Sequence, residues 1–441
     1  MKKCTKRVWV IMVMMVFFTG VAQADELQEL KAYIQSLEAR VAQLEKNPNK
    51  DGLAAIKAKV AEIEKRRDDT SGSEFKVYWQ EGLRLDSADG QTKLKIGGRV
   101  MYDWSWSRED DAFGTQEDGH EFRRARLYSA GTIYDNIGYK FQYDFAGGKS
   151  LVKDVYIEIK DFPGAALKVG HFKEPIGLNE ITSDKYVTFV EPALPMAFVP
   201  SRNAGLMLHK ENANSTWAAG VFRSTDEDGE HEASGAYAAT GRVTYAPVKS
   251  SDRRHVVHLG AAASHRSQNN SNTVQYRSRP ESHLFGRPVD TGLVEAENVS
   301  LYGLEAAWVA GSFSMQGEYI MASTDSPSGS SDVNFSGYYL QSSYFLTGES
   351  QNYKKGVFSR VKPKKNYNRK NGTHGAWELA ARYSSLDLNS GTVNGGELDD
   401  ITLGLNWYLN PNTRIMLNCI HADAKENGDA DLGVMRFQVD F

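Results

Sequence analysis

Cysteine is almost absent from the 441-residue sequence, which contains only Cys4 and Cys419. Cys4 lies in an N-terminal segment that we expect to be removed, so that Cys419 alone would remain in the mature chain. No intrachain disulfide could then form. An exported protein of this size must therefore be stabilised in another way.

The sequence also lacks several features that would place it in other classes. No apolar run after the N-terminus is long enough for a membrane-spanning helix. The 52 Lys and Arg residues against 56 Asp and Glu give a net charge of −4, which argues against a partner that is a nucleic acid. We find no Walker loop, no G-x-S-x-G, no C-x-x-C and no histidines at metal-ligand spacing. The sequence therefore predicts no catalysis, metal or cofactor; a hydrolase with Ser and His on facing strands is the remaining catalytic alternative.

Residues 1–24 have the pattern of a signal peptide. Four basic residues precede an apolar stretch over residues 8–21, and Ala22-Gln23-Ala24 has the A-x-A form of a cleavage site. We expect the mature chain to begin at Asp25. The alternative is an uncleaved anchor helix, for which the apolar stretch is short.

Residues 25–67 have a helical pattern. Apolar residues recur at spacings of three and four from Leu27 to Leu44, and in a second register from Leu53 to Ile63. The pattern predicts an α-helical coiled coil of two or three strands, with an amphipathic helix packed on the rest of the chain as the alternative. Residues 68–92 are predicted to form a linker and a short hairpin.

The period changes to two from residue 93 onward. In KLKIGGRVMYDWSW (93–106) one face holds Leu, Ile, Val, Tyr and Trp, and the other holds Lys, Arg, Asp and Ser. The same division recurs in YKFQYDF (139–145) and in VMRFQVDF (434–441). Segments of about ten residues have the length that a tilted strand needs to cross lipid. Residues 93–441 are therefore predicted to be all-β: a transmembrane antiparallel β-barrel of about 16 strands, embedded in outer-membrane lipid. A soluble two-sheet protein is the alternative, and fourteen or eighteen strands remain open.

The stretch HEFRRARLYSAGTIY (120–134) concentrates positive charge on one predicted strand. Arg124 and Arg126 share a face, and Arg99 lies on the same face of the neighbouring strand. A guanidinium facing lipid costs about 2–4 kcal/mol at the midplane, so we expect these side chains to point into the lumen. They could alternatively pair with acids across the wall.

Three long segments are not predicted as barrel strands. Residues 173–202 hold four prolines and several acids and are predicted to be a loop folded into the pore, with a surface loop as the alternative. Residues 267–297 carry Arg277, Arg279 and Arg287, which could form a basic funnel or belong to a solvated loop. Residues 347–373 fall on the opposite side of the barrel, with eight basic residues against one acid. Those charges could draw anions through, unless a strand pair is miscounted.

The chain resembles the phosphate-selective porins O and P over residues 93–441. Matching motifs include KIGGR (95–99), FRRARL (122–127), LKVGHFKEPIGLNEITS (167–183), RSRPE (277–281) and YGLEAAWVAGSFSMQGEY (302–319). The resemblance implies a sixteen-stranded barrel that assembles as a homotrimer. It also implies passage of small inorganic anions such as phosphate along an arginine ladder to a constriction.

The resemblance assigns roles to individual residues. The constriction or anion-binding positions are Arg99, Arg124, Asp154 and Ser183; the ladder positions are Arg123, Arg277 and Arg279; and the exit-side lysines are Lys95 and Lys168.

The sequence departs from the family at four positions. Glu180 stands where phosphate-selecting members have lysine, Asp184 replaces a serine, and Pro192 and Glu281 replace arginines. Glu180, Asp184 and Pro192 together make the gate four charge units more negative. One charge about 4 Å away is worth about 4 kcal/mol at an effective dielectric constant near 20. We therefore expect passive diffusion of small hydrophilic solutes, with phosphate selection weakened or lost.

Two other functions remain open. One is a broad or cation-tolerant general porin. The other is a structural outer-membrane tether in which residues 25–67 grip peptidoglycan or an S-layer.

Overall fold

The computed structural model describes the chain from residue 75 onward except for residues 110–117, 227, 231–235, 269–271, 328–330 and 426, together with scattered residues between 32 and 62. The predicted signal peptide lies outside the described residues. So does the predicted coiled coil, apart from a few helical residues such as Ala32 and Val60; both stay predictions. No helix among the described residues is long and apolar enough to cross a membrane. The larger of the chain's two compact units comprises residues 76–86 and 90–441 and is described below.

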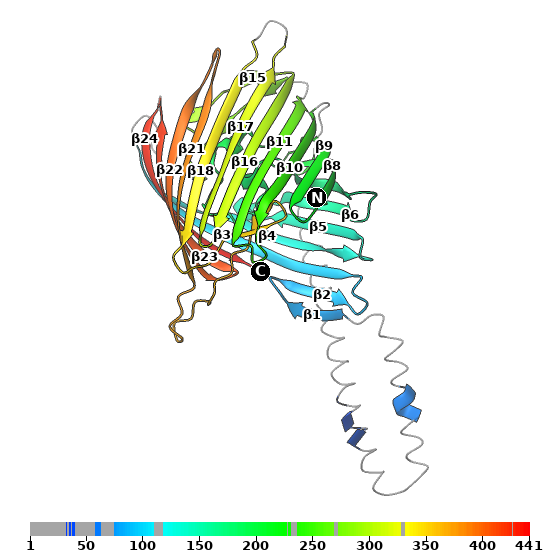
Figure 1. Ribbon diagram of the computed structural model, residues 1–441. Helices are drawn as coiled ribbons and strands as arrows, with labels where there is room; N and C mark the ends of the chain where they lie inside the picture. The colour runs from blue at the N-terminus through cyan, green and yellow to red at the C-terminus, as the bar shows by residue number, and fades with distance from the viewer. Residues whose placement is uncertain are drawn as a thin grey trace, which may run out of the picture. The chain divides into compact units, whose positions relative to one another are not determined.

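Sixteen antiparallel strands close into a barrel (Figure 1). In chain order they are β3 (Lys93–Glu109), β4 (Gly119–Ile133), β5 (Ile137–Asp144), β6 (Leu151–Ile159), β7 (Ala166–Lys173), β8 (Arg202–Glu211), β9 (Ser215–Arg223), β10 (Tyr237–Lys249), β11 (His255–Ser267), β16 (Asn298–Ala310), β17 (Phe313–Asp325), β18 (Asn334–Phe345), β21 (Ala376–Ser390), β22 (Val393–Asn410), β23 (Thr413–Ala424) and β24 (Gly428–Asp440). Each strand pairs with the next, and β24 pairs back with β3 so that Val439 lies opposite Val100. The predicted closed barrel of sixteen strands is confirmed.

Two short strands precede the barrel. They are β1 (Phe75–Trp79) and β2 (Leu83–Ser87), which pair with each other. β2 also pairs with residues 93–96 at the start of β3, whereas β24 pairs with residues 99–109 of the same strand. The hairpin therefore adds two strands at the start of β3 only. The ring of sixteen strands stays closed, because the rest of β3 pairs with β24.

Side chains alternate between the two faces of the wall as the two-residue period predicts. On β24, Phe437 and Val439 are exposed on the outer face, whereas Arg436 and Asp440 are buried on the inner face. Trp104 on β3 is likewise exposed outward. Apolar side chains outward and polar ones inward are typical of a barrel that lies in lipid.

The connections sort into two ends of the barrel. At the loop end lie the connections that follow β3, β5, β7, β9, β11, β17, β21 and β23; the connection after β5 holds the 3-10 helix η3 (Ala146–Gly148). At the turn end lie residues 134–136, 160–165, 212–214, 250–254, 311–312, 346–375 and 411–412. The long basic connection 346–375 is therefore at the end of the short turns, as the strand count predicts.

Residues 174–201, the inner loop, fold into the barrel and carry α3 (Leu178–Ile181) and η4 (Leu194–Phe198). The backbone N–H groups of Leu178 and Asn179 donate to the Glu318 carboxylate of β17 at 2.6 and 2.7 Å. Further along, the Val190 N–H donates to Asn418 of β23 at 2.8 Å. The prediction that this segment folds inward is confirmed, and the loop is fastened to the wall that runs from β17 to β23.

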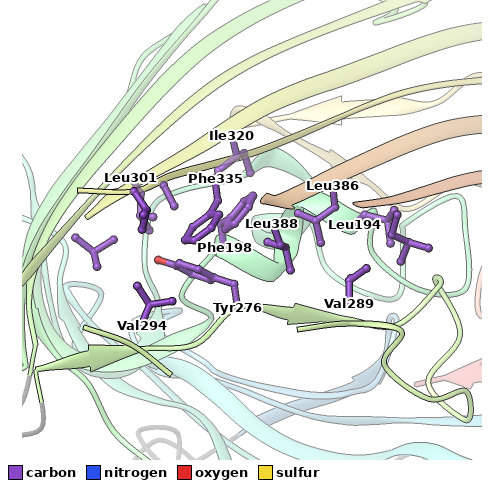
Figure 2. Packing of buried hydrophobic residues seen from close by; sticks show 14 of the residues in the cluster. Leu194, Phe198, Tyr276, Val289, Val294, Leu301, Ile320, Phe335, Leu386 and Leu388 are labelled. Carbon is purple, nitrogen blue, oxygen red and sulfur yellow. The ribbon is translucent and has the colours of Figure 1, made fainter. Parts of the chain in front are cut away.

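A hydrophobic core fills part of the lumen between the inner loop and that wall (Figure 2). The loop contributes Leu194 and Phe198, and the inner faces of β17 and β18 contribute Ile320 and Phe335. Residues 273–295 also fold inward as two small ladders, β12 (Thr273–Val274) with β15 (Val294–Glu295), and β13 (Arg277–Ser278) with β14 (Val289–Asp290). Tyr276 from this segment packs into the core. The side of the barrel from β11 to β23 is thus packed with apolar side chains at the loop end.

A second insertion enters from the turn end. Residues 346–375 contain a hairpin of β19 (Asn352–Lys354) and β20 (Val357–Ser359). Its Tyr353 and Phe358 are buried against Leu178 of the inner loop and against the wall. Arg242 on β10 donates to the Gly356 carbonyl at 2.9 Å, which holds the hairpin tip inside the barrel.

Candidate functional site

A β-bulge concentrates positive charge at the mouth of β4. Met101 of β3 pairs with Arg124 and Tyr102 pairs with Phe122, so that Arg123 is the extra residue. An extra residue shifts the alternation by one and redirects a side chain. Arg123 and Arg124 therefore both point into the lumen, whereas Phe122 is exposed outside.

Three arginines converge on one carboxylate of the inner loop. Asp184 accepts a hydrogen bond from Arg126 Nη1 at 2.9 Å, and it forms ion pairs with Arg124, whose Nε lies 2.6 Å away, and with Arg99. Arg99 Nη1 lies 3.4 Å from the Ser183 hydroxyl, while its buried Nε has no acceptor among the described residues. The cluster thus brings a hydroxyl and several guanidinium donors to one point.

A second loop acid, Glu191, lies between two other arginines. Arg123 donates to it through Nε and Nη2, both at 2.9 Å, and Arg436 of β24 donates at 2.7 Å. Arg436 also forms a fork with Asp103 at 2.7 and 2.6 Å. Burial raises the pKa of the Glu191 carboxyl, but the attraction of Arg123, Arg124 and Arg436 outweighs it and holds that pKa well below the usual range. Glu191 is therefore ionised and fixes the loop against the arginine-bearing wall.

Two further acids are paired with cations that stand at the two ends of the inner loop. Asp154 accepts from Arg202 Nε at 2.7 Å and pairs with Lys140. Lys173 Nζ lies 3.1 Å from the Glu180 carboxylate. Burial raises the pKa of Glu180, but Lys173 and Arg202 more than offset it, so that the pKa is lowered and the group is charged.

Three lysines line the lumen, and their charges are less fully neutralised by nearby carboxylates than those of the arginines. Lys168 lies 3.4 Å from Glu158 and 4.6 Å from the centre of the Tyr156 ring. Lys95 stands over the Tyr128 ring at 5.5 Å, with no salt bridge to any described carboxylate. Burial lowers the pKa of Lys185 on the inner loop to about 8, with Asp440 opposing the shift and Arg99 and Arg360 adding to it.

The network as a whole has an excess of positive charge. Among the described residues, twelve cations and nine carboxylates belong to it. The cations are Lys95, Arg99, Arg123, Arg124, Arg126, Lys140, Lys168, Lys173, Lys185, Arg202, Arg360 and Arg436; the carboxylates are Glu81, Asp103, Asp144, Asp154, Glu158, Glu180, Asp184, Glu191 and Asp440. An excess of fixed cations attracts small anions and repels small cations.

Acids of the far wall do not cancel this excess. Glu318 and Asp400 are buried, and the Glu318 carboxylate is occupied by the backbone of the inner loop. Within the described part of the chain, no three acidic, histidine or cysteine side chains converge to hold a metal ion. The arrangement can attract and pass anions.

Comparison with known proteins agrees with this geometry. The sequence model of the family described as phosphate-selective porin O and P matches residues 94–441. The chain belongs to that family.

Two relatives and two solved structures resemble this porin. Porin O of Pseudomonas aeruginosa is 28% identical, with 82% of this chain and 91% of the relative covered. An uncharacterised protein of Caulobacter vibrioides is also 28% identical, over 95% of this chain and 90% of its own. A loop-deletion form of OmpT from Vibrio cholerae covers 80% of this chain and all of its own at a TM-score of 0.53 and 11% identity. The anion-selective porin of Comamonas acidovorans covers 79% and 100% at a TM-score of 0.52 and 14% identity.

The two solved structures have the same fold as this chain at low sequence identity, and the family match identifies the chain as a porin. The protein is an outer-membrane porin of the bacterial cell envelope. Since short turns face the periplasm in such barrels, the turn end of this porin is periplasmic and the loop end is extracellular.

The structure brings some of the predicted site residues of the porin together and separates others. Arg99, Arg124, Ser183 and Asp184 form one cluster, and Arg123 lies next to it on Glu191.

The remaining predicted residues lie elsewhere. Lys95 and Lys168 lie near the periplasmic ends of β3 and β7, whereas Asp154 and Glu180 pair with Arg202 and Lys173, where β8 and β7 meet the inner loop. Of the predicted ladder, Arg279 donates to the Phe285 carbonyl at 2.7 Å, and Arg277 is exposed on β13. Neither forms an ion pair with the described carboxylates of the network.

Several network residues carry no predicted role. Lys140 and Arg436 lie on the polar face of their strands, so the two-residue period could have identified both. Lys173 and Arg202 stand at the two ends of the inner loop, where their acid partners depend on how the loop folds. No local signal in the sequence reveals those pairings.

Proposed function

We propose that this porin conducts small inorganic anions, phosphate among them, by passive diffusion along the side of the lumen lined by β3 to β9. The observation that carries the proposal is the cluster at Asp184, where Arg99, Arg124 and Arg126 share a single loop carboxylate beside Ser183. Three guanidiniums around one acid leave donors for an oxyanion, and guanidinium matches such an ion in geometry and charge.

The two acids that depart from the family pattern are compensated by neighbouring cations. Asp184 is held by strand arginines, and Glu180 is held by Lys173. Both acids thus neutralise cations rather than present free negative charge to the pore. The remaining excess of cations supports anion preference, with weaker phosphate binding than an uncompensated arginine cluster would give.

The relatives support the same class of solute. One is named Porin O, and one structural neighbour is described as an anion-selective porin. Passive conduction requires no catalytic group or cofactor, and we propose none for this protein.

We also propose that the porin assembles as a homotrimer. Strands β5 to β9 have only eight to ten residues, whereas the other eleven barrel strands have twelve to eighteen. The barrel wall is therefore shorter along β5 to β9 than elsewhere. A shorter wall suits contact with a neighbouring subunit, and the family resemblance implies a trimer.

A planar-bilayer recording tests the conduction proposal. In a KCl gradient the reversal potential should show that chloride is more permeant than potassium, and added phosphate should reduce the chloride current. Arg99→Gln should weaken that block, whereas Lys149→Gln, at an exposed lysine of the 145–150 connection, should leave it unchanged. Potassium selectivity would refute anion conduction, and chloride selectivity without any phosphate effect would remove phosphate from the proposed solutes.

A further inference from the structure

The periplasmic connection 346–375 divides into two parts with different positions. Its hairpin, β19 with β20, lies inside the barrel. The next part, residues 362–374, is here called the basic arm; the connection to which it belongs extends beyond the strand ends of the barrel (Figure 1). The arm does not line the lumen, so the sequence-based idea that its charges draw anions through does not fit its position.

The arm rests on the outer wall. The Tyr367 ring packs edge-on against the Trp407 ring with centres 5.1 Å apart, and the Tyr367 N–H donates to the Leu409 carbonyl at 2.6 Å. Trp407 Nε1 in turn donates to the His374 carbonyl at 2.7 Å. On β22 the side chains of Asn406 and Tyr408 are buried on the inner face, so Trp407 between them points outward. The arm is thus tied to the lipid-facing side of the wall at Tyr367 and at its C-terminal end.

This part of the wall has the residues of a membrane–water interface. Trp407 stacks on Trp377 of β21 with ring centres 5.1 Å apart and an angle of 10° between the planes. Tryptophan and tyrosine gather at the level of lipid headgroups because their rings prefer apolar surroundings while their N–H and O–H groups need polar ones. The arm therefore lies at the headgroup level of the periplasmic leaflet.

The arm itself is an ordered turn. Asn368 and Thr373 pair through two backbone hydrogen bonds of 3.0 and 3.1 Å, and the Thr373 hydroxyl donates to the Asn366 carbonyl at 2.6 Å. The tip, which carries Arg369 and Lys370, is held between these contacts. The backbone that carries these cations is therefore ordered before a ligand binds, which lowers the entropy cost of binding.

The charge of the arm is compensated only at its start, where Glu81 lies near Lys362 and the Glu349 carboxylate accepts from the Lys364 N–H at 2.9 Å. The arm contains Lys362, Lys364, Lys365, Arg369 and Lys370, and no acidic residue occurs in the sequence between Glu349 and Glu378. Lys365, Arg369 and Lys370 are exposed, and none of the three forms a salt bridge with a described carboxylate. Lys362 reaches Glu81 only at 4.0 Å.

We propose that the basic arm binds the phosphodiester headgroup of an anionic phospholipid in the periplasmic leaflet of the outer membrane. The positive charge of the arm favours an anion as its ligand. The position of the arm favours a lipid, because the arm is tied to the outer wall beside interfacial tryptophans. Lysine and arginine stems reach past such rings and place their charges at the phosphate level. The proposal is independent of which ions the pore conducts.

Lipid titration of the purified full-length porin in detergent, followed by native mass spectrometry, tests the proposal. Phosphatidylglycerol should bind at least about tenfold more tightly than zwitterionic phosphatidylcholine. Each surface cation contributes about fivefold, equivalent to about 1 kcal/mol. The triple variant Lys365→Gln, Arg369→Gln, Lys370→Gln should therefore lose roughly a hundredfold in affinity for phosphatidylglycerol. A matched variant, Lys76→Gln, Lys149→Gln, Arg287→Gln, removes three exposed cations from separate segments and should lose little.

Thermal unfolding of the purified folded variants gives a second measurement, which does not depend on how much of each variant folds. Phosphatidylglycerol should raise the thermal unfolding temperature of the wild type and of the matched variant, and should not raise that of the arm variant. Equal binding of the two lipids, or full phosphatidylglycerol binding by the arm variant, would overturn the proposal. Displacement of bound phosphatidylglycerol by millimolar inorganic phosphate would also overturn it, since a soluble anion would then be the preferred ligand.

Discussion

Neutralising Asp184 should make the porin more anion-selective. Its carboxylate faces Arg99, Arg124 and Arg126, and its side chain is 16% exposed in the lumen. A unit charge about 4 Å from a passing ion is worth about 1 kcal/mol in water and about 4 kcal/mol at an effective dielectric constant near 20. Because the Asp184 side chain is partly exposed to the lumen, we take a value near the lower figure. Asp184→Asn should then raise the chloride-to-potassium permeability ratio by at least about fivefold.

Reversal potentials in a KCl gradient measure this ratio directly. Asp184→Glu keeps the charge and should stay near the wild type. Glu211→Gln, which removes a carboxylate paired with Lys355 at the periplasmic rim, controls for loss of an acid outside the constriction. The folded barrel of each variant can be verified by its heat-dependent electrophoretic mobility. A folded Asp184→Asn porin with unchanged or lower chloride preference would refute the assignment of this cluster to the selectivity of the pore.

Three further predictions test other parts of the network. Because burial lowers the pKa of Lys185 to about 8, its ammonium is charged below that pH and neutral above it, so anion preference should fall between pH 7 and about 9.5; Lys185→Arg should abolish this pH dependence in reversal-potential measurements. Arg436→Met leaves Asp103 and Glu191 without their shared partner and should destabilise the barrel by about 3–5 kcal/mol in urea unfolding; a smaller loss than in an exposed Lys149→Met control would contradict a structural role. Replacing residues 351–360 by a short Gly-Ser linker removes the hairpin from the lumen and should increase single-channel conductance, whereas Tyr353→Phe should not; equal conductance in the deletion variant would place the hairpin outside the ion path.

The barrel could be predicted because its signals are local. A strand needs only a two-residue alternation and a length of about ten residues, and both are visible around Arg99 and in residues 434–441. The same alternation correctly places Arg124 and Arg126 inside. It does not reveal the bulge that turns Arg123 inward, because the bulge depends on the pairing of β4 with β3.

The interior could not be predicted in the same way. Residues 267–297 could form a funnel, but Tyr276 and Val289 within them belong to a core shared with β17 and β18. The apolar residues that receive them, such as Leu301, stand on the inner face of strands whose outer face is also apolar. A pattern with both faces apolar does not say which side meets lipid. The inner face of these strands is covered by the folded loops, and the sequence of the strands alone does not predict that packing.

The position of the loop acids is determined mainly by residues that a permeating ion does not meet. Buried arginines of the far wall donate to inner-loop carbonyls: Arg414 to Val187 at 2.7 Å and Arg382 to Glu191 at 3.1 Å.

Asn406 adds a bond to the Thr188 carbonyl at 2.8 Å, so the loop backbone is held along the stretch between Asp184 and Glu191. Since these donors are buried and satisfied by the loop backbone, they fix where Asp184 stands relative to the opposite arginines. The same backbone would place a serine or lysine at that point with equal precision. Selectivity in this porin can therefore change through single substitutions on the loop while the far wall and the arginine-bearing strands stay as they are.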